Sequence, residues 1–462
     1  MAKTRPEKLI RDAVHGDMVF DSRTEMAVID TPEVQRLRGV KQLGTASLVY
    51  PTATHTRFDH SLGTCWIAKR ILAGLREKGV RASDEEREAV ALAALLHDVT
   101  HIPFGHTFED ERRLFERHDA PERVRAFLAR GQAAKVLRSL GSHDAVLSIL
   151  TGRRGGRPFL RQIVAGTICA DLLDYLARDA LFCGLSQRYD ERIFRYFSVV
   201  DGELVLEAQK DGIVRADALS EIVNLLRLRY FLSERVYFHH AKTASGAMVS
   251  KAVELCLARG LTLADLFPLK DEGLFQYLRA RFGRDRTIEK LLDRIETRRI
   301  YKRAYVLTRK VGEALQGSLI ERYHADRAGR EKAEAAIERR GKLEKGDVVV
   351  YCPSAGMSLK EAEVPLRLSA GRPRPLSELG LPEVEELRQK HRNLWKFYVF
   401  VSPERPEAVR DAARAAEEYF ALPNELVSLQ SGQSYLSWAG SEPERAGARM
   451  RDPGQGATPD EG

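Results

Sequence analysis

The chain has 462 residues, of which 44% are hydrophobic, and it carries a formal net charge of +8. That apolar content excludes a disordered chain, and the length exceeds the ~250–300 residues at which one core stops growing, so we expect one large domain and a smaller unit. No apolar run approaches the ~18 residues of a membrane span and residues 1–16 lack a signal-peptide core, so we expect a cytoplasmic protein without a membrane partner.

Helical periodicity dominates the chain from residue 59 to about residue 340. Ser83 followed by Glu86 forms a capping-box pattern, which marks the start of a helix. Pro103 makes continuation of that helix costly. The predicted helices are 59–78, ended by Gly79; 83 to Pro103; 159–182, ended by Gly184; and 216–258, as one or two helices.

The pattern changes after residue 340, where short runs rich in Val and aromatic residues alternate with polar segments. The runs 346–352, 364–368 and 393–401 are predicted strands, and 406–422 is a predicted amphipathic helix. The predicted fold class is therefore mainly α. The expected units are a helical domain over 1–340, a small α+β domain over 341–430, and a disordered tail over 441–462.

The densest cluster of ionisable side chains lies in LLHDVTHIPFGHTFEDE, residues 95–111. His97 and Asp98 emerge from an apolar helix, and His106 and Glu109 follow soon after. Burying such groups without partners would cost several kcal/mol each, so packing alone does not explain them. A divalent cation does, because imidazole and carboxylate ligands suit Zn, Mn, Fe or Ni and leave positions open for water and phosphate oxygens.

Two further segments carry helix-borne ligands of the same kinds. His60 opens an amphipathic helix in RFDHSLG, and Asp171 opens DLLDYLARD. Taken alone, His60 would be read as a capping or buried structural histidine. In the second segment the polar residues recur at spacings of three and four and share one helix face, which by itself is typical of a solvated surface.

Together these segments resemble the HD superfamily of metal phosphohydrolases. They are most similar to its deoxynucleoside triphosphate (dNTP) triphosphohydrolase branch, which includes bacterial dGTPase-like enzymes and the human SAM- and HD-domain dNTPase. The resemblance rests on an ordered set of motifs: DTPEVQRLRGVKQLG (30–44), THTRFDHSLG (54–63), HDVTHIPFGHTFEDE (97–111), DLLDYLARD (171–179) and RYFLSERVYFHH (229–240). It extends more weakly to about residue 425 and implies an HD-domain helical bundle whose core spans about 50–185.

The resemblance implies a role for each matching residue. The implied ligands of one divalent transition metal are His60, His97, Asp98 and Asp171. The implied catalytic residues at the α-phosphate are His106, Glu109 and His118. The implied substrate contacts are Arg57, His101 and Arg229 for phosphate, Gln42, Tyr175, Asp179 and Tyr237 for the sugar, and Leu43 where a ribose 2′-hydroxyl would clash. Mg²⁺ would bridge the nucleotide phosphates.

The implied reaction is attack of a metal-activated water on the α-phosphorus. His106, oriented by Glu109, would donate a proton to the departing 5′ oxygen. Triphosphate and a deoxynucleoside would be released. Asp30, Gln35 and Arg38 match residues that read a GTP or dGTP effector, and such activation accompanies dimers or tetramers.

Two departures from the family pattern leave alternatives open. Leu172 stands where the family usually has a Lys or Arg that touches phosphate, so triphosphate specificity is open. Arg11 replaces an Asn, and the second effector site is matched only by Arg298 and Lys302, so nucleotide activation is open too. The alternatives are an HD phosphohydrolase acting on another nucleotide or phosphodiester, or a non-catalytic nucleic-acid-binding regulator. The positive net charge is compatible with weak binding of single-stranded nucleic acid.

The five cysteines are scattered and show no CxxC spacing. Neither a disulfide framework nor a thiolate zinc site is therefore expected.

Overall fold

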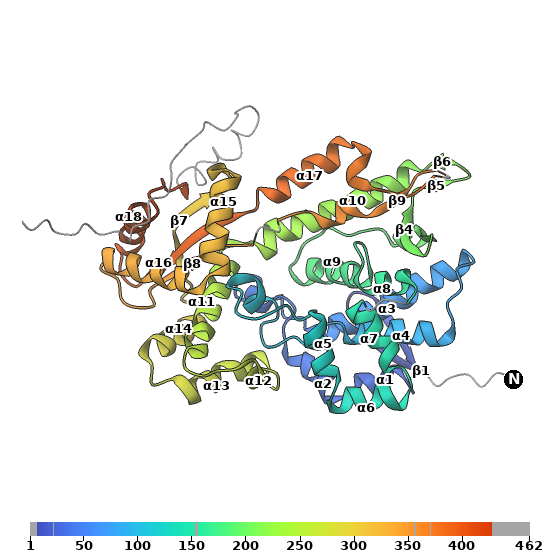
Figure 1. The fold of residues 1–462 in the computed structure, drawn as a ribbon, viewed down its shortest axis with the longest axis horizontal. Helices are drawn as coiled ribbons and strands as arrows, with labels where there is room; N and C mark the ends of the chain where they lie inside the picture. Colours follow the sequence, from blue (N-terminus) through green and yellow to red (C-terminus); the bar gives the residue numbers. More distant parts are fainter. Residues whose placement is uncertain (1–6, 22, 153–155, 355–356, 370, 427–462) are drawn as a thin grey trace, which may run out of the picture.

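The computed structural model describes residues 7–21, 23–152, 156–354, 357–369 and 371–426. Helices α1 to α9 gather at one end of the molecule, and strands β7 and β8 with helices α15, α16 and α18 gather at the other (Figure 1). Helices α10 and α17 extend alongside one another between the two ends. The predicted fold class, mainly α, is confirmed. The expected tail over 441–462 lies outside the described residues.

The N-terminal part consists of a β-hairpin followed by a helical bundle. Its elements are β1 (Glu7–Asp12), β2 (Gly16–Asp21), α1 (Glu25–Ile29), α2 (Pro32–Arg36), α3 (Arg57–Glu77), α4 (Asp84–Leu96), α5 (Pro121–Leu128), α6 (Gly131–Ser139), α7 (His143–Thr151), α8 (Pro158–Ala165) and α9 (Ala170–Phe182). Capping boxes start both long helices, from Thr56 with Asp59 and from Ser83 with Glu86. Helix α3 packs against both α4 and α9, so the ends of three helices meet.

The remainder of the chain adds further helices and two larger sheets. Its elements are β3 (Phe197–Val200), β4 (Glu203–Glu207), β5 (Gln209–Lys210), β6 (Ile213–Val214), α10 (Ala216–Leu232), α11 (His240–Leu257), α12 (Leu263–Leu266), α13 (Asp271–Phe282), α14 (Arg286–Glu296), β7 (Lys302–Thr308), α15 (Glu313–Ile320), α16 (Arg327–Arg340), β8 (Val348–Tyr351), β9 (Pro365–Arg367), β10 (Arg374–Pro375), α17 (Pro382–Arg392), β11 (Lys396–Val401) and α18 (Ala408–Phe420).

The two sheets connect different parts of the sequence. The first has the order β7-β11-β8 and is antiparallel throughout. Strand β7 precedes residue 341, so this sheet draws on both sides of the expected domain boundary, and β7 is not among the predicted strands. The second sheet has the order β10-β9-β4-β3, in which β9 pairs parallel to β4. Leu359, Ala362 and Val364, just before β9, are buried in the same apolar cluster as residues of α3, α4 and α9. The C-terminal part therefore returns to the helical bundle.

Two predicted helices differ from the observed ones. The helix starting after Ser83 ends at Leu96, well before Pro103, with His97 as its C-cap. The single helix expected over 159–182 is two helices, α8 and α9, with a break between them. Gly166 lies in that break, where a Cβ would come within 2.4 Å of the Gln162 carbonyl oxygen. Both interruptions place proposed metal ligands at helix ends.

Among the described helices, none combines the length and apolarity needed to cross a bilayer. The five cysteines are buried and form no disulfide.

Candidate metal centre and histidine cluster

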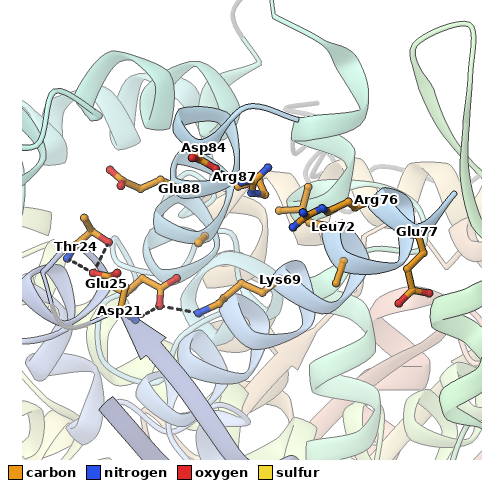
Figure 2. A pocket seen from close by; sticks show the side chains of 12 residues that line it. Asp21, Thr24, Glu25, Lys69, Leu72, Arg76, Glu77, Asp84, Arg87 and Glu88 are labelled. Atoms are coloured by element: carbon orange, nitrogen blue, oxygen red, sulfur yellow. Dashed lines mark hydrogen bonds and ion pairs between the residues drawn. The ribbon is translucent and has the colours of Figure 1, made fainter. Parts of the chain in front are cut away.

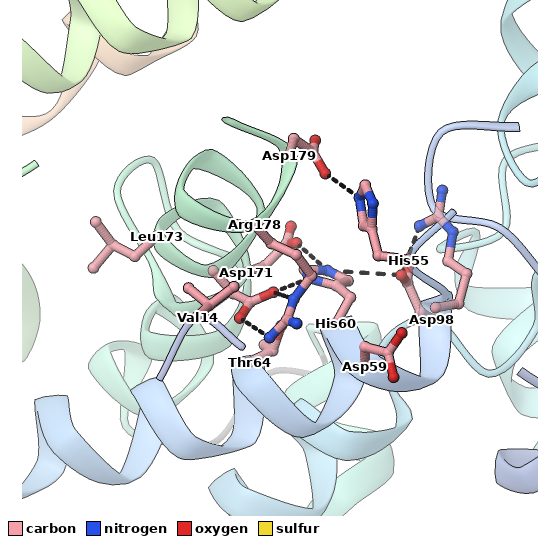
Figure 3. Close-up of polar contacts among 12 residues, drawn as sticks. Val14, His55, Asp59, His60, Thr64, Asp98, Asp171, Leu173, Arg178 and Asp179 are labelled. Atoms are coloured by element: carbon pink, nitrogen blue, oxygen red, sulfur yellow. Dashed lines mark hydrogen bonds and ion pairs between the residues drawn. The ribbon is translucent and has the colours of Figure 1, made fainter. Parts of the chain in front are cut away.

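Three helix ends bring the expected metal ligands together. His60 lies in the first turn of α3, His97 and Asp98 follow the last turn of α4, and Asp171 lies in the first turn of α9. Figure 3 shows His60 pointing from α3 toward Asp171, with Asp98 on its other side. Packing of α3 against α4 and α9 is what produces this meeting point.

The ligand atoms of His60, His97 and Asp171 lie close enough to share one ion, and Asp98 approaches both imidazoles. The Nε2 atoms of His60 and His97 are 3.1 Å apart. Asp171 Oδ1 lies 2.9 Å from the Nε2 of His60 and 3.6 Å from that of His97. Asp98 Oδ2 lies 3.7 and 3.6 Å from the same two atoms. The Asp171 side chain is 36% exposed and the other three are at most 11% exposed, so the group opens to solvent on the Asp171 side.

The hydrogen bonds behind the two imidazoles show that a cation fits between them. His60 Nδ1 lies 2.7 Å from Asp174 Oδ2, and His97 Nδ1 lies 2.8 Å from the Ala94 carbonyl oxygen. Both acceptors require the proton on Nδ1, so each neutral ring directs its Nε2 lone pair at the other. Burial lowers the pKa of His60, but hydrogen bonds to Asp171 and Asp174 outweigh it and raise that pKa to about 10, so a proton takes this position unless a metal cation displaces it. Two nitrogen and two carboxylate donors suit a divalent transition metal.

Asp174 anchors the metal group from behind. Besides His60, it accepts hydrogen bonds from His15 Nε2 at 2.6 Å and from Arg178 Nε at 2.8 Å. Arg178 also pairs with Asp12 of the N-terminal hairpin. Burial raises the pKa of Asp174, but the Arg178 guanidinium and the hydrogen bonds from His15 and His60 outweigh it and hold that pKa well below its usual range. A carboxylate on the far nitrogen of a ligand histidine fixes the tautomer and orientation of the ring.

Asp98 connects the metal group to a cluster of three histidines. Its Oδ2 accepts a 2.6 Å hydrogen bond from Arg57 Nη1, and its Oδ1 lies 3.2 Å from His101 Nε2 and 3.4 Å from His118 Nε2. Burial raises the pKa of Asp98, but the Arg57 guanidinium and the neighbouring histidines lower it by more. The pKa is well below its usual value, so this carboxyl is ionised.

Glu109 organises the histidine cluster. Its Oε2 lies 3.0 Å from His106 Nδ1 and 3.2 Å from His118 Nδ1, and its Oε1 accepts the His118 backbone N–H at 2.9 Å. These bonds outweigh burial and hold the pKa of Glu109 far below its usual range. The His106 side chain is 38% exposed, whereas His101 and His118 are buried. His106 is therefore the member best placed to reach a substrate.

His101 is buried without a hydrogen bond on either ring nitrogen within the described part of the chain. Its ring stacks on that of His118 at a centroid distance of 3.7 Å. Burial, with Arg57 and His118 nearby, lowers its pKa well below the usual value. Its Nε2 has only the Asp98 Oδ1 contact at 3.2 Å, and its Nδ1 has no hydrogen-bond partner among the described residues, so this buried imidazole keeps a nitrogen open to a ligand. His101, His106 and His118 also lie close enough together to hold a metal ion themselves.

The expected sugar-side residues form a second layer next to α9. Asp179 accepts hydrogen bonds from Tyr237 Oη at 2.6 Å and His55 Nε2 at 2.8 Å. The Gln42 side-chain oxygen is buried without a partner among the described residues. Leu43 packs against the apolar core. Of these expected residues, Gln42 therefore keeps an open hydrogen-bonding position.

Arg229 lies over two aromatic rings of the same region, Tyr175 and Tyr237. Its guanidinium carbon is 5.7 Å from the Tyr175 ring centroid and 5.0 Å from that of Tyr237. Its Nε donates to Glu361 Oε1 at 3.1 Å. An expected phosphate contact is thus paired with a carboxylate from the C-terminal part.

The expected effector residues lie apart from the metal group, at the junction of α1 and α2. Asp30 ends α1 and is exposed, and Thr31 rather than Asp30 takes the N-cap position of α2. Gln35 donates to the Ile29 carbonyl oxygen and accepts from Arg38 Nε at 2.8 Å. Arg38 lies 3.6 Å above the Phe58 ring.

Three residues of the centre were not assigned roles from the sequence: His15, His55 and Asp174. Asp174 had a usable signal, because it lies one turn after Asp171 on the same helix face. The helix face expected to be solvated is buried at Asp174, Arg178 and Asp179. His15 and His55 lie far from their partners in sequence, and only tertiary packing pairs them with α9.

A separate cavity of about 680 Å³ lies between α3 and α4 (Figure 2). Its charged side chains are of both signs and partly paired, as in the bond between Lys69 and Glu25. No histidine lines it. It therefore lacks the donor set of the metal group.

Comparison with known proteins agrees with this arrangement. The family model for the HD domain matches residues 57–179, and that for the HD associated region matches residues 190–429. An uncharacterized protein of Methanocaldococcus jannaschii is 31% identical over 64% of this chain and 59% of its own length. The deoxynucleoside triphosphate triphosphohydrolase SAMHD1 homolog of Dictyostelium discoideum is 29% identical over 57% of this chain and 50% of its own length.

The fold also matches solved structures. A phosphohydrolase from Bacteroides thetaiotaomicron superposes with a TM-score of 0.66 at 22% identity, covering 86% of this chain and all of the other. The sequence matches span only about half to three-fifths of the length of the relatives. The HD-associated model alone covers more than half of the chain, and the metal group lies within the HD match. The chain belongs to the HD family of phosphohydrolases, with an HD domain followed by an HD-associated region.

Proposed function

We propose that this protein hydrolyses deoxynucleoside triphosphates to a deoxynucleoside and inorganic triphosphate in a metal-dependent reaction. The observation that carries the proposal is the convergence of His60, His97, Asp98 and Asp171, with Asp98 connecting them to the cluster of His101, His106 and His118. A divalent cation held by the first four would supply Lewis-acid chemistry and lower the pKa of water near the phosphate. The similarity to a dNTP triphosphohydrolase supports the substrate class.

The chain's own residues account for the proton transfer and for charge stabilisation. His106 is hydrogen-bonded through Nδ1 to the ionised Glu109, which leaves its Nε2 to donate a proton to the departing 5′ oxygen. Such a positioned acid typically contributes ~10²–10⁴-fold to the rate. Arg57 and His101 lie on either side of Asp98 and stabilise negative charge on the phosphate. His118 shares Glu109 and keeps that carboxylate in place.

The sugar would lie against Asp179, Tyr237, Tyr175 and Gln42. Asp179 and Tyr237 form a hydrogen-bonded pair that can bind the 3′-hydroxyl, and the unpartnered Gln42 oxygen offers an acceptor. Leu43 packs against the apolar core, so a ribose 2′-hydroxyl at that point would meet carbon rather than a hydrogen-bonding group. An added hydroxyl that loses its water without gaining a partner is rejected, which gives selectivity for deoxynucleotides.

GTP or dGTP activation, with assembly into a dimer or tetramer, is a further part of the proposal. Its support is the grouping of Asp30, Gln35 and Arg38 around α2. Arg36 of the same helix donates to the carbonyl oxygens of Val99 and His101. A nucleotide bound at α2 would therefore act directly on the segment that follows the metal ligands. Turnover and light scattering with and without GTP test this part.

The decisive experiment is a product assay combined with metal analysis. Purified protein is incubated with each dNTP, NTP and dNMP in the presence of Mn²⁺, Fe²⁺, Ni²⁺, Zn²⁺ or Mg²⁺, and the phosphate product is identified. We expect inorganic triphosphate from dNTPs, and we expect His97→Ala to abolish both bound metal and turnover. Release of pyrophosphate or orthophosphate instead, or full turnover by His97→Ala without stoichiometric metal, would contradict the proposal.

A further inference from the structure

A cavity of about 500 Å³ opens directly beside Asp171. Its volume is within the ~300–1,000 Å³ typical of small-molecule sites. One wall comes from α8 and the start of α9, and the opposite wall comes from the turn Lys360–Glu363 just before β9. Asp171 is the exposed member of the metal group, so this cavity adjoins the side on which that group is open. The residues relevant here are Arg161, Asp171, Leu172, Tyr175, Lys360 and Glu361.

The uncompensated charge around this cavity is positive. Glu361 is neutralised by Arg229, and Asp171 belongs to the proposed metal set. Arg161 and Lys360 are exposed, and neither side chain has a hydrogen bond or ion pair within the described residues. Leu172 lines the α9 wall and is 4% exposed, so that wall provides no cation at this point. An anion that enters the cavity therefore meets its free positive charge at Lys360 and Arg161.

The turn that carries Lys360 is held firmly against the HD bundle. Leu359 and Ala362, on either side of it, are buried in the bundle's apolar cluster. Glu361 is fixed by its bond to Arg229, and Glu363 accepts a 2.8 Å hydrogen bond from Ser377. The backbone of Lys360 is thus fixed at the cavity rim while its ammonium remains free. A lysine whose backbone is fixed and whose ammonium can move is well suited to bind phosphate oxygens.

We propose that Lys360, with Arg161 at the same cavity, binds the β- and γ-phosphates of the nucleotide, so that the C-terminal part completes the triphosphate site. The identity of this ligand rests on the proposed function. With the α-phosphate at the metal group, the rest of the triphosphate must extend through an opening, and the cavity beside Asp171 provides one. Its two free cations supply the charge that Leu172 does not.

Lys360→Ala tests the proposal. We expect the KM for dNTP and the inhibition constant of inorganic triphosphate to rise together by ~10-fold, the lower end for a charged hydrogen bond at a solvent-exposed site. Hydrolysis of bis(p-nitrophenyl) phosphate, which has no distal phosphates, should stay within ~2-fold, since the metal group is untouched. Lys360→Arg should retain triphosphate binding. Lys345→Ala is the matched control, because Lys345 is an exposed lysine of the C-terminal part that does not line the cavity.

Calorimetric titration with inorganic triphosphate separates failure of this inference from failure of the proposed function. Wild-type protein that binds triphosphate but releases none from any dNTP would contradict the proposed function. The role of Lys360 would then still be tested by comparing the triphosphate affinities of wild type and Lys360→Ala. Equal triphosphate affinities for wild type and Lys360→Ala would overturn the inference, whatever the turnover. A wild type that binds no triphosphate would overturn it as well.

Discussion

Replacing Asp174 by asparagine tests how the metal group is held. Asp174 is fully buried and accepts hydrogen bonds from His60 Nδ1 at 2.7 Å, His15 Nε2 at 2.6 Å and Arg178 Nε at 2.8 Å. An asparagine removes the charge and turns one acceptor oxygen into an NH₂ group that faces donors. The His60 ring then loses its fixed tautomer and part of its basicity.

The substitution Asp174→Asn should weaken both metal binding and the stability of the fold. Loss of a carboxylate behind a ligand histidine typically weakens metal binding ~10–100-fold, which corresponds to about 1.4–2.8 kcal/mol. Arg178 keeps Asp12 as its other partner, so its charge is not left unpaired. The free energy of unfolding should therefore fall by about 1–3 kcal/mol, less than the ~3–5 kcal/mol expected for an unpaired buried charge. The chain should therefore still fold and bind metal more weakly.

The assay is calorimetric titration of metal-stripped protein with Mn²⁺, together with thermal unfolding of the same samples. Asp179→Asn is the matched control, because Asp179 is a buried carboxylate of the same helix that binds His55 and Tyr237 rather than a metal ligand. Its metal affinity should stay at the wild-type value. A folded Asp174→Asn protein with wild-type metal affinity would refute the reasoning, since His60 would then not depend on the carboxylate behind it.

Two further predictions concern the acid and the pH dependence of stability. His106→Ala should lower kcat by ~10²–10³-fold while bound metal, measured by elemental analysis, stays stoichiometric; loss of metal instead would place His106 among the ligands. Burial raises the pKa of Glu338 to about 7, against the Lys251 ammonium and two backbone N–H groups that lower it. Between pH 4.5 and 7 the folded chain then keeps a proton that the unfolded chain has released, so the free energy of unfolding falls as pH rises, by up to about 3 kcal/mol. Glu338→Gln should remove that slope in urea unfolding at pH 5 and pH 8, and parallel pH profiles for variant and wild type would contradict this.

Local sequence signals were sufficient where a single segment determines its own structure. Ser83 with Glu86 formed the predicted capping box, and the change to Val- and aromatic-rich runs after residue 340 marked strands that the structure contains. Such signals act through neighbouring backbone groups and side-chain periodicity, so they can be read without knowledge of the fold.

The same locality explains two errors. The helix expected over 159–182 satisfied the periodicity rule, but the backbone becomes extended at Gly166 and the helix ends there. The strand β7 was missed because its partner β11 lies about ninety residues later in the chain, and β propensity depends on such partners.

The sequence by itself determined the residue types of the candidate centre: imidazoles and carboxylates emerging from apolar helices, in an order that identifies the HD family. Only the tertiary structure decided what stands behind and beside them. His15 reaches Asp174 from the N-terminal hairpin, and the turn at Lys360 returns to the bundle from the far end of the chain. The His15–Asp174 contact joins residues 159 positions apart, and the bond of Glu361 in that turn to Arg229 joins residues 132 apart. No periodicity encodes such contacts, because they arise from the packing of whole elements rather than from any one segment.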